Sequence, residues 1–208
     1  MSSSHHPFLV VLSSPSGAGK TSICRGVVAR DPGVAYSVSA TTRPKRKGEV
    51  HGRSYFFYSE KQFLARVRRN GLLEHARVYD HFYGTPRANV LARFGQGRDV
   101  IADLDIQGMR SCKRALPGTV GIFITAPSRA ELARRLRDRG TDSTATIARR
   151  EAELKVELAA IPDFDYLVVN DRLEAAVDRV LAIIRAERMR TARLRGVALR
   201  LGQPKGAR

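Results

Sequence analysis

The chain has 208 residues, of which 43% are hydrophobic and 27% charged, a composition typical of a globular protein and unlike a disordered one. Its length is that of one domain carrying insertions, or of two small domains. Lys and Arg number 37 against 20 Asp and Glu, and the resulting net charge of +17 favours anionic partners such as nucleic acid, an acidic membrane or phosphorylated small molecules, without choosing among them.

The N-terminal region and the cysteines both favour a cytoplasmic protein. Phe8 to Leu12 is the longest apolar run near the N-terminus, far shorter than the roughly 18 residues that cross a bilayer, and no basic segment precedes it. Cys24 and Cys112 belong to no metal or disulfide motif. We therefore expect a cytoplasmic location and no membrane partner.

Short apolar runs alternate with helical patterns along the chain. Strands are predicted over residues 8–13, 34–38, 100–104, 120–125 and 166–170. Helices are predicted over 20–30, 60–70, 129–139, 144–160 and 172–190, with a further helix that ends near Gly95. Strands that alternate with helices predict an α/β fold built on a parallel sheet.

Several helix starts carry capping signals. Capping boxes are predicted at Ser59 with Gln62, Ser128 with Glu131, and Asp171 with Glu174. Thr85 is predicted to cap a helix that has Pro86 at its first position.

The pattern changes between residues 39 and 97. Short aromatic strands such as 54–58 appear there, together with turn signals at Gly48 and Gly52. This change predicts a small mixed subdomain inserted into the α/β core.

The C-terminal segment is strongly basic. Residues 185–208 hold eight basic side chains and one acid, Glu187, and contain no aromatic residue on which a base could stack. We expect a solvated tail rather than an RNA-binding arm: no specific nucleic-acid partner, and at most weak nonspecific affinity. The oligomeric state is left open.

Residues 14–21 form a candidate phosphate loop. Ser14-Pro15-Ser16-Gly17-Ala18-Gly19-Lys20-Thr21 fits the pattern G-x-x-x-x-G-K-[ST] except that Ser14 replaces the first glycine. Glycines let backbone N–H groups curl around phosphate oxygens, and the N-terminus of the following helix adds positive potential. This predicts that Lys20 contacts the β- and γ-phosphates of a nucleoside triphosphate and that Thr21 is a ligand of Mg²⁺.

An apolar strand that ends in carboxylates follows at residues 100–105. Asp103 and Asp105 alternate and are predicted to share one face of that strand. A strand-end carboxylate holds Mg²⁺ directly or through water in phosphate-loop enzymes, so we expect Asp103 to join Thr21 at the metal.

A series of motifs resembles the guanylate kinase family. Besides the phosphate loop, the chain carries S-A-T-T-R-P-x-R-x-G-E-x-x-G-x-x-Y-x-F from Ser39, G-L-L-E from Gly71, Y-G-T from Tyr83, D-L-D-I-Q-G from Asp103, R-L-R-D-R-G-T from Arg135 and V-N-D from Val169. The resemblance extends from about Phe8 to Arg190. It implies Mg²⁺-dependent transfer of the γ-phosphoryl group of ATP to GMP, and to dGMP, giving ADP and GDP in purine nucleotide metabolism.

The resemblance also implies an organisation. The guanylate kinase-like domain would cover 7–190, with a three-layer phosphate-loop core (7–38, 98–134 and 151–190) around a parallel sheet. A small mixed α/β GMP-binding subdomain (39–97) and a helical lid (135–150) would be inserted, and residues 191–208 would form the basic tail.

Site residues follow by matching the family's motifs. ATP would be bound by Ser14 to Thr21, Arg135, Arg139 and Asn170, the last near adenine. GMP would be bound by Ser39, Arg43, Arg46, Tyr55, Glu74, Tyr83, Thr85 and Asp105. The residues that act on the transferring group would be Lys20, Arg43, Arg139 and Arg150.

The chemistry of these side chains suits guanine monophosphate. Guanine offers two adjacent donors, N1–H and the 2-amino group, which one carboxylate at Glu74 can accept, whereas adenine lacks that pair. Guanidinium and phenol groups suit the acceptor phosphate. Tyr55 also has a simpler interpretation as a core residue in an aromatic run.

Two alternatives remain. A ribose 1,5-bisphosphate phosphokinase would share the core, but the Glu74, Ser39 and Thr85 set argues against it. A non-catalytic phosphopeptide-binding module of guanylate-kinase type tends to lack the loop lysine and lid arginines, which this chain retains.

Overall fold

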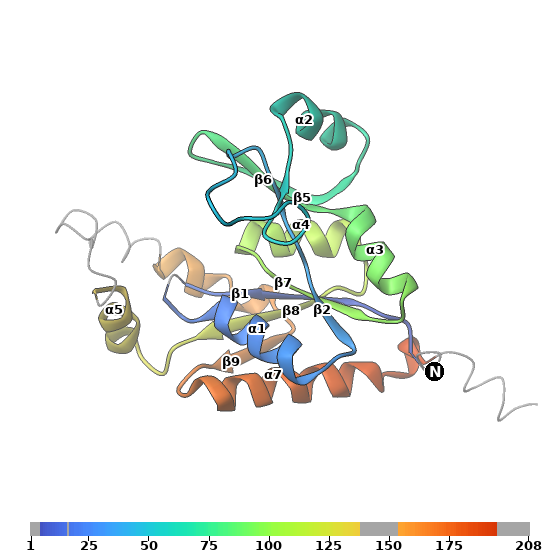
Figure 1. Ribbon diagram of the computed structural model, residues 1–208. Helices are drawn as coiled ribbons and strands as arrows, with labels where there is room; N and C mark the ends of the chain where they lie inside the picture. Colours follow the sequence, from blue (N-terminus) through green and yellow to red (C-terminus); the bar gives the residue numbers. More distant parts are fainter. Residues whose placement is uncertain (1–4, 16, 138–153, 195–208) are drawn as a thin grey trace, which may run out of the picture.

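A parallel sheet of five strands forms the centre of the molecule (Figure 1). The computed structural model describes residues 5–15, 17–137 and 154–194. The strand order is β2-β7-β1-β8-β9, and every neighbouring pair is parallel. The strands are β1 (Leu9–Ser13), β2 (Val34–Tyr36), β7 (Asp99–Asp103), β8 (Val120–Thr125) and β9 (Tyr166–Val169). The predicted α/β fold with a parallel sheet is confirmed.

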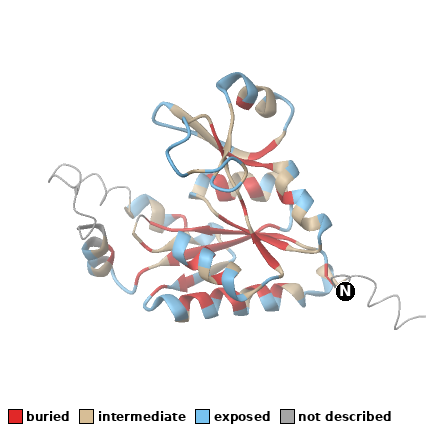
Figure 2. Ribbon diagram, in the orientation of Figure 1, coloured by how far each residue is buried: buried red, intermediate tan, exposed pale blue. Residues whose placement is uncertain are grey.

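Helices cover both faces of this sheet. On one side lie α1 (Lys20–Arg30) and α7 (Leu173–Arg188), and on the other α3 (Arg87–Gly95) and α4 (Ile106–Ala115). Alternate residues of the central strand serve the two layers: Val10 and Leu12 pack toward α1 and α7, while Leu9 and Val11 pack toward α3 and α4. Because β1 is fully buried on both faces (Figure 2), it reads as a continuous apolar run rather than an alternating one.

A second, smaller sheet stands beside the core. It has the order β4-β3-β6-β5, with β3 and β4 parallel and the other pairs antiparallel. Its strands are β3 (Ala40–Thr41), β4 (Phe56–Phe57), β5 (Leu72–Val78) and β6 (His81–Pro86), and helix α2 (Glu60–Arg68) packs on it through the buried Phe63. Leu72 joins this small core, whereas Leu73, on the opposite face of β5, packs with Met109 and Cys112 of α4. Adjacent residues of one strand thus fasten the two cores together.

Two of the four predicted caps are wrong. Ser59 forms the complete capping box with Gln62, and the Ser128 hydroxyl accepts from the Glu131 amide at the start of α5 (Arg129–Arg137). Thr85, however, lies inside β6, and Pro86 itself precedes the helix α3. Asp171 pairs with Arg179 at 2.7 Å and does not cap α7, which begins after Arg172. In both failures another partner engages the capping side chain.

Several element ends also differ from the predictions. Strand β2 ends at Tyr36 rather than at residue 38, and β4 covers only 56–57 of the expected 54–58. Residues 154–159 of the helix predicted over 144–160 are helical and lead into η1 (Ile161–Asp163); the rest lies outside the described residues, as does most of the predicted lid (135–150). No helix in the described part of the chain is long and apolar enough to cross a membrane.

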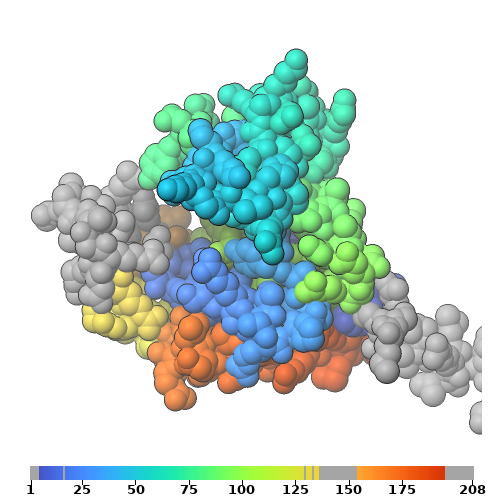
Figure 3. Space-filling view, viewed as in Figure 1, coloured from blue at the N-terminus to red at the C-terminus, as the bar shows by residue number. Residues whose placement is uncertain are grey.

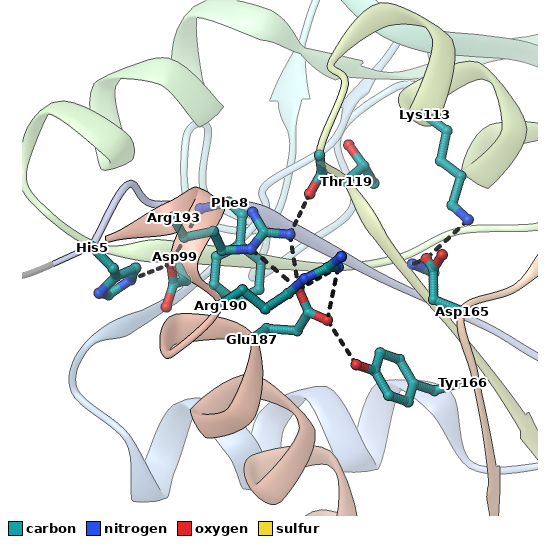
Figure 4. A network of polar contacts seen from close by, with 12 residues as sticks. His5, Phe8, Asp99, Lys113, Thr119, Asp165, Tyr166, Glu187, Arg190 and Arg193 are labelled. Atoms are coloured by element: carbon teal, nitrogen blue, oxygen red, sulfur yellow. Dashed lines mark hydrogen bonds and ion pairs between the residues drawn. The ribbon is translucent and has the colours of Figure 1, made fainter. Parts of the chain in front are cut away.

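The first and last residues that the structure describes meet at the edge of the main sheet where the strands begin (Figure 4). His5 forms a β-bridge with Leu194, and the short helix η2 (Thr191–Arg193) packs beside it. Arg193 binds the buried Glu187 at 3.0 Å and stacks on the Phe8 ring. Residues 191–194, which the sequence analysis assigned to the basic tail, are therefore anchored to the core.

A buried carboxylate, Asp99, organises this edge. It is fully buried at the start of β7 and lies 3.0 Å from the His5 ring nitrogen and 2.7 Å from Arg188 Nε, and it accepts the Phe8 amide at 3.2 Å. Arg188 also binds Asp31 at 2.8 Å. One carboxylate thus ties the N-terminal segment to α7.

Asp99→Ala is expected to lower the free energy of unfolding by about 3 kcal/mol, because it leaves the buried Phe8 amide without this acceptor and removes one of the two carboxylates that bind the half-buried guanidinium of Arg188. Urea denaturation followed by circular dichroism measures the change. Asp178→Ala, which removes an exposed ion pair with Arg30, is the matched control and should cost less than about 1 kcal/mol. Equal losses in the two variants would show that Asp99 does not hold this edge together.

Candidate active site

The candidate phosphate loop connects β1 to α1, as predicted. Gly17 and Gly19 have φ angles of 86° and 90°, in the left-handed region that favours glycine, and Gly19 is the N-cap of α1. The Ala18 amide donates to the Pro15 carbonyl, which tightens the turn. The loop therefore curls over a helix N-terminus, where backbone N–H groups attract anions. Ser16 lies outside the described residues.

Lys20 folds back across this loop. Its Nζ lies 3.3 Å from the carbonyl oxygen of Ser14, whose hydroxyl in turn donates to the Pro15 carbonyl. Burial lowers the pKa of Lys20, and the carboxylates of Asp103 and Asp105 oppose that shift. The ammonium group is thus held beside the loop, partly withdrawn from water.

Thr21 meets Asp103 where β7 ends. The Thr21 hydroxyl donates to Oδ2 of Asp103 at 2.6 Å, and the Tyr36 hydroxyl donates to Oδ1. Asp105 does not share a strand face with Asp103, because β7 has ended and Asp105 instead caps α4 by accepting the Gly108 amide at 2.6 Å. The prediction of a shared strand face was therefore wrong, yet both carboxylates line the cavity described next.

A cavity of about 690 Å³ lies between the second sheet and the carboxyl ends of the main strands, and Figure 3 shows a hollow between these two parts. Its walls come from both sheets and from α1. Seven predicted site residues line it: Thr21, Ser39, Tyr55, Glu74, Tyr83, Asp103 and Asp105. Tyr36, Ser37 and Glu49 line it as well. Residues predicted for ATP, GMP and the metal therefore share one space.

Glu74 is the most perturbed carboxyl group in this cavity. Burial raises its pKa to about 7; the Thr85 hydroxyl, which donates at 2.7 Å, opposes the rise, and Asp105 adds to it. Thr85 is fully buried and does not line the cavity, so its hydroxyl is directed at Glu74. The pair places one hydroxyl-supported carboxyl group in the cavity wall.

Basic and phenolic groups gather on the side of the second sheet. Arg43 lies 2.6 Å from Glu49 and has its guanidinium carbon 5.5 Å from the centre of the Tyr55 ring. Tyr55 and Tyr83 meet edge to face with ring centres 6.1 Å apart. Hydrogen bonding to Glu49 raises the pKa of Arg43, so its positive charge is permanent. Glu49 also accepts a hydrogen bond from the backbone N–H of Arg46. Arg46 is exposed and does not line the cavity.

Arg135 and Asn170 lie on the other side of the phosphate loop. The Asn170 amide nitrogen donates to the Ala18 carbonyl at 2.8 Å, and Arg135 donates to the Asn170 carbonyl at 3.1 Å and to Glu131 at 2.7 Å. A Cβ on Gly19 would lie only 2.7 Å from that amide nitrogen, so the close packing requires glycine. Asn170 thus braces the loop. Arg139 and Arg150 fall outside the described residues.

Several residues that line the cavity were missed by the sequence reasoning, among them Tyr36, Ser37 and Glu49. Tyr36 ends a strand, and Ser37 follows it, where no phosphate-binding motif stands, and Glu49 lies inside a recognised motif without an assigned role. The signal that could have found Tyr36 is its position: it ends a strand that neighbours the strand carrying Asp103. The carboxyl ends of neighbouring parallel strands meet at one edge, which is where α/β proteins bind ligands.

Comparison with known proteins identifies this arrangement. The family model for guanylate kinase matches residues 7–187. The guanylate kinase of Thermotoga maritima is 46% identical over 185 residues, which cover 89% of each chain, and that of Rhodospirillum rubrum is 45% identical over 96% of this chain and 92% of its own. The crystal structure of guanylate kinase from Anaplasma phagocytophilum superposes with a TM-score of 0.74 at 31% identity, covering 95% of this chain and 94% of that one. With the loop, the carboxylates and the cavity in place, the chain belongs to the guanylate kinase family.

Proposed function

We propose that this protein transfers the γ-phosphoryl group of ATP to GMP, and to dGMP, giving ADP and the corresponding diphosphate. One observation carries the proposal: Glu74, whose carboxyl group suits guanine, and Thr21, at the phosphate loop, line the same cavity. A donor and an acceptor nucleotide bound there would have their phosphates directed toward each other. Holding two reactants in line is the main requirement of phosphoryl transfer.

Glu74 is proposed to read guanine. As a carboxylate it accepts N1–H and the 2-amino group together, and Thr85 supports it from behind. Adenine carries no such pair of donors and would leave the carboxylate with the Thr85 hydroxyl but without two donors from the base, which costs free energy. Ser39, with its hydroxyl, and Asp105, with its carboxylate, are proposed to complete the base contacts.

The acceptor phosphate is proposed to bind Arg43, Arg46, Tyr55 and Tyr83. Arg43 carries a permanent charge beside both phenols, and guanidinium and phenol donors match phosphate oxygens. Because the phosphate oxygen of GMP is already ionised at neutral pH, no side chain has to remove a proton from it. Charge neutralisation and positioning are the work of the protein.

The triphosphate is proposed to lie on residues 14–21, braced by Asn170, with Arg135 beside it. Lys20 supplies a positive charge to the transferring group. The same role is proposed for Arg139 and Arg150 on the resemblance alone. The proposed domain boundaries, with a GMP-binding subdomain over 39–97 and a lid over 135–150, rest on the same resemblance.

The oxygen donors of Thr21 and Asp103 fit a magnesium ion. Mg²⁺ prefers hydroxyl, carboxylate and water oxygens, and these two side chains present theirs 2.6 Å apart beside the phosphate loop. Thr21 and Asp103, the latter directly or through water, are proposed to hold it. When bound it would neutralise charge on the β- and γ-phosphates.

A panel of acceptors tests the activity. ADP formation from ATP with Mg²⁺ is expected to be fast with GMP, slower with dGMP and near background with AMP, CMP, UMP or ribose 1,5-bisphosphate. Turnover with only the sugar bisphosphate would contradict the base pocket while sparing the phosphate loop. GMP binding without ADP formation would instead indicate a binding module.

The pKa of Glu74 predicts a pH dependence of GMP use. Since this pKa is raised to about 7 and the ionised form accepts the guanine donors, kcat/KM for GMP should rise with pH from about 6 to 8 and then level off. Glu74→Gln should lower kcat/KM for GMP about 10- to 100-fold, as expected for lost bonds to a charged acceptor, and should abolish that rise. Only the titration of the GMP phosphate, with a pKa near 6, should remain. An identical pH profile in the variant would remove Glu74 from guanine recognition.

Lys20→Met is expected to lower kcat about 100- to 1,000-fold, the usual loss when one charged donor to a transition state is removed. Lys113→Met is the matched control, because Lys113 is paired with Asp165 at the opposite edge of the sheet. Steady-state kinetics on both variants, with thermal unfolding to confirm folding, measure the effect. Equal activity of Lys20→Met and the wild type would contradict the loop assignment.

A further inference from the structure

Tyr36 is joined to the proposed metal site by a contact that no recognised motif anticipates. Tyr36 is the last residue of β2 and lies opposite Ile101 of β7. Asp103, two residues after Ile101, is the last residue of β7. Its hydroxyl donates to Oδ1 of Asp103, while the Thr21 hydroxyl donates to Oδ2 at 2.6 Å. Each carboxylate oxygen therefore accepts one hydroxyl hydrogen.

The phenol is placed as a donor, because a carboxylate oxygen can only accept the hydrogen bond that joins the two groups. The partly buried ring packs against the core beneath α1, so the hydroxyl is held in place by the rest of the side chain.

We infer that Tyr36 is a positioning residue for the divalent cation: its hydroxyl fixes the Asp103 carboxylate with Oδ2 toward Thr21, so that the oxygen pair for Mg²⁺ is formed before nucleotide binds. This inference rests on the proposed function, because Thr21 and Asp103 serve a metal only if the protein uses a metal–nucleotide complex. Tyr36 would act through Asp103 and would not itself be a ligand of the ion.

A second hydrogen bond is needed because the Asp103 carboxylate can rotate about its terminal torsion. The terminal torsion of Asp has a broad profile, so one hydrogen bond from Thr21 leaves the group able to turn. The nearby Lys20, whose charge is coupled to Asp103, favours any orientation that brings an oxygen closer to its ammonium group. A second hydroxyl on Oδ1 opposes that turn. It does so without a competing positive charge, which an arginine or lysine in its place would bring to a cation site.

The test is the coupling between Mg²⁺ and nucleotide. The dissociation constant of β,γ-imido-ATP, measured by calorimetry without and with Mg²⁺, gives a ratio that reports the protein–metal contacts. Tyr36→Phe, which removes only the hydroxyl, should reduce this ratio about tenfold, the usual effect of one hydrogen bond to a charged group. It should also raise the Mg²⁺ concentration for half-maximal activity.

Tyr166→Phe is the matched control. It also removes a phenol–carboxylate hydrogen bond, of 2.7 Å to Glu187, but at the opposite edge of the sheet (Figure 4). It should leave the ratio unchanged even if both variants lose similar stability. Asp103→Asn supplies the baseline, because it removes the proposed metal ligand.

The outcomes separate the inference from the proposed function. A wild-type ratio in Tyr36→Phe, together with a reduced ratio in Asp103→Asn, would overturn the role of Tyr36 and leave the metal site intact. Equal ratios in wild type and Asp103→Asn would contradict the metal site itself.

If Tyr36→Phe fails to fold, 3-fluorotyrosine placed at residue 36 of the otherwise unchanged protein gives a second measurement. Its ¹⁹F resonance should shift when Mg²⁺ joins the bound nucleotide analogue, and the same label at residue 166 should not shift. A resonance at 36 that is insensitive to Mg²⁺ would overturn the inference.

Discussion

The register of β1 between its two neighbours is the constraint on which the site depends. Leu12 lies opposite Asp103 on β7, and Ser13 lies opposite Phe123 on β8, so the phosphate loop emerges at the edge where both neighbouring strands end. The 2.6 Å contact between Thr21 and Asp103 exists only in this register. A shift by one residue would exchange the two sets of β1 side chains between the core clusters. Close packing on both faces of β1 therefore also fixes the chemistry beyond its end.

Carboxylates on the two sides of the main sheet have different partners. At the edge where the strands begin, the buried Asp99 and Glu187 are paired with Arg188 and Arg193, which closes that edge. Beyond the edge where the strands end, the partly buried Asp103 of β7 and Glu74 of β5, in the second sheet, receive hydrogen bonds from hydroxyl groups. A hydroxyl orients a carboxylate but does not cancel its charge, so the group stays available to a cation or to donors of a ligand. The protein has a net charge of +17, yet the partners that orient these two carboxylates are neutral hydroxyl groups rather than arginines in ion pairs.

Much of the fold and part of the site were predictable from local sequence. The apolar run before residues 14–21 and the helix after it identify the phosphate loop, since strand, turn glycines and helix are adjacent in the chain. The errors arise where distant residues compete. Thr85 has the composition of a cap but is drawn into β6 and bonded to Glu74, and Asp171 is engaged by Arg179 eight residues later. Tyr36 could not be assigned because its importance comes from a contact 67 residues away, set by strand pairing rather than by any motif.

If Glu74 binds guanine as proposed, its burial gives specificity a physical basis beyond shape. In the ligand-free cavity, burial favours the protonated form, with a pKa raised to about 7, so an ionised Glu74 is costly unless donors arrive. Guanine would supply two such donors in place of the lost water and so recover the cost. A base without them leaves either an unpaired charge or a neutral carboxyl group that lacks its strongest interactions. A solvated carboxylate at the same position would accept the same bonds from guanine, but it would penalise other bases far less, because water would satisfy it in their presence. Discrimination at this site thus grows with the desolvation that makes Glu74 difficult to ionise.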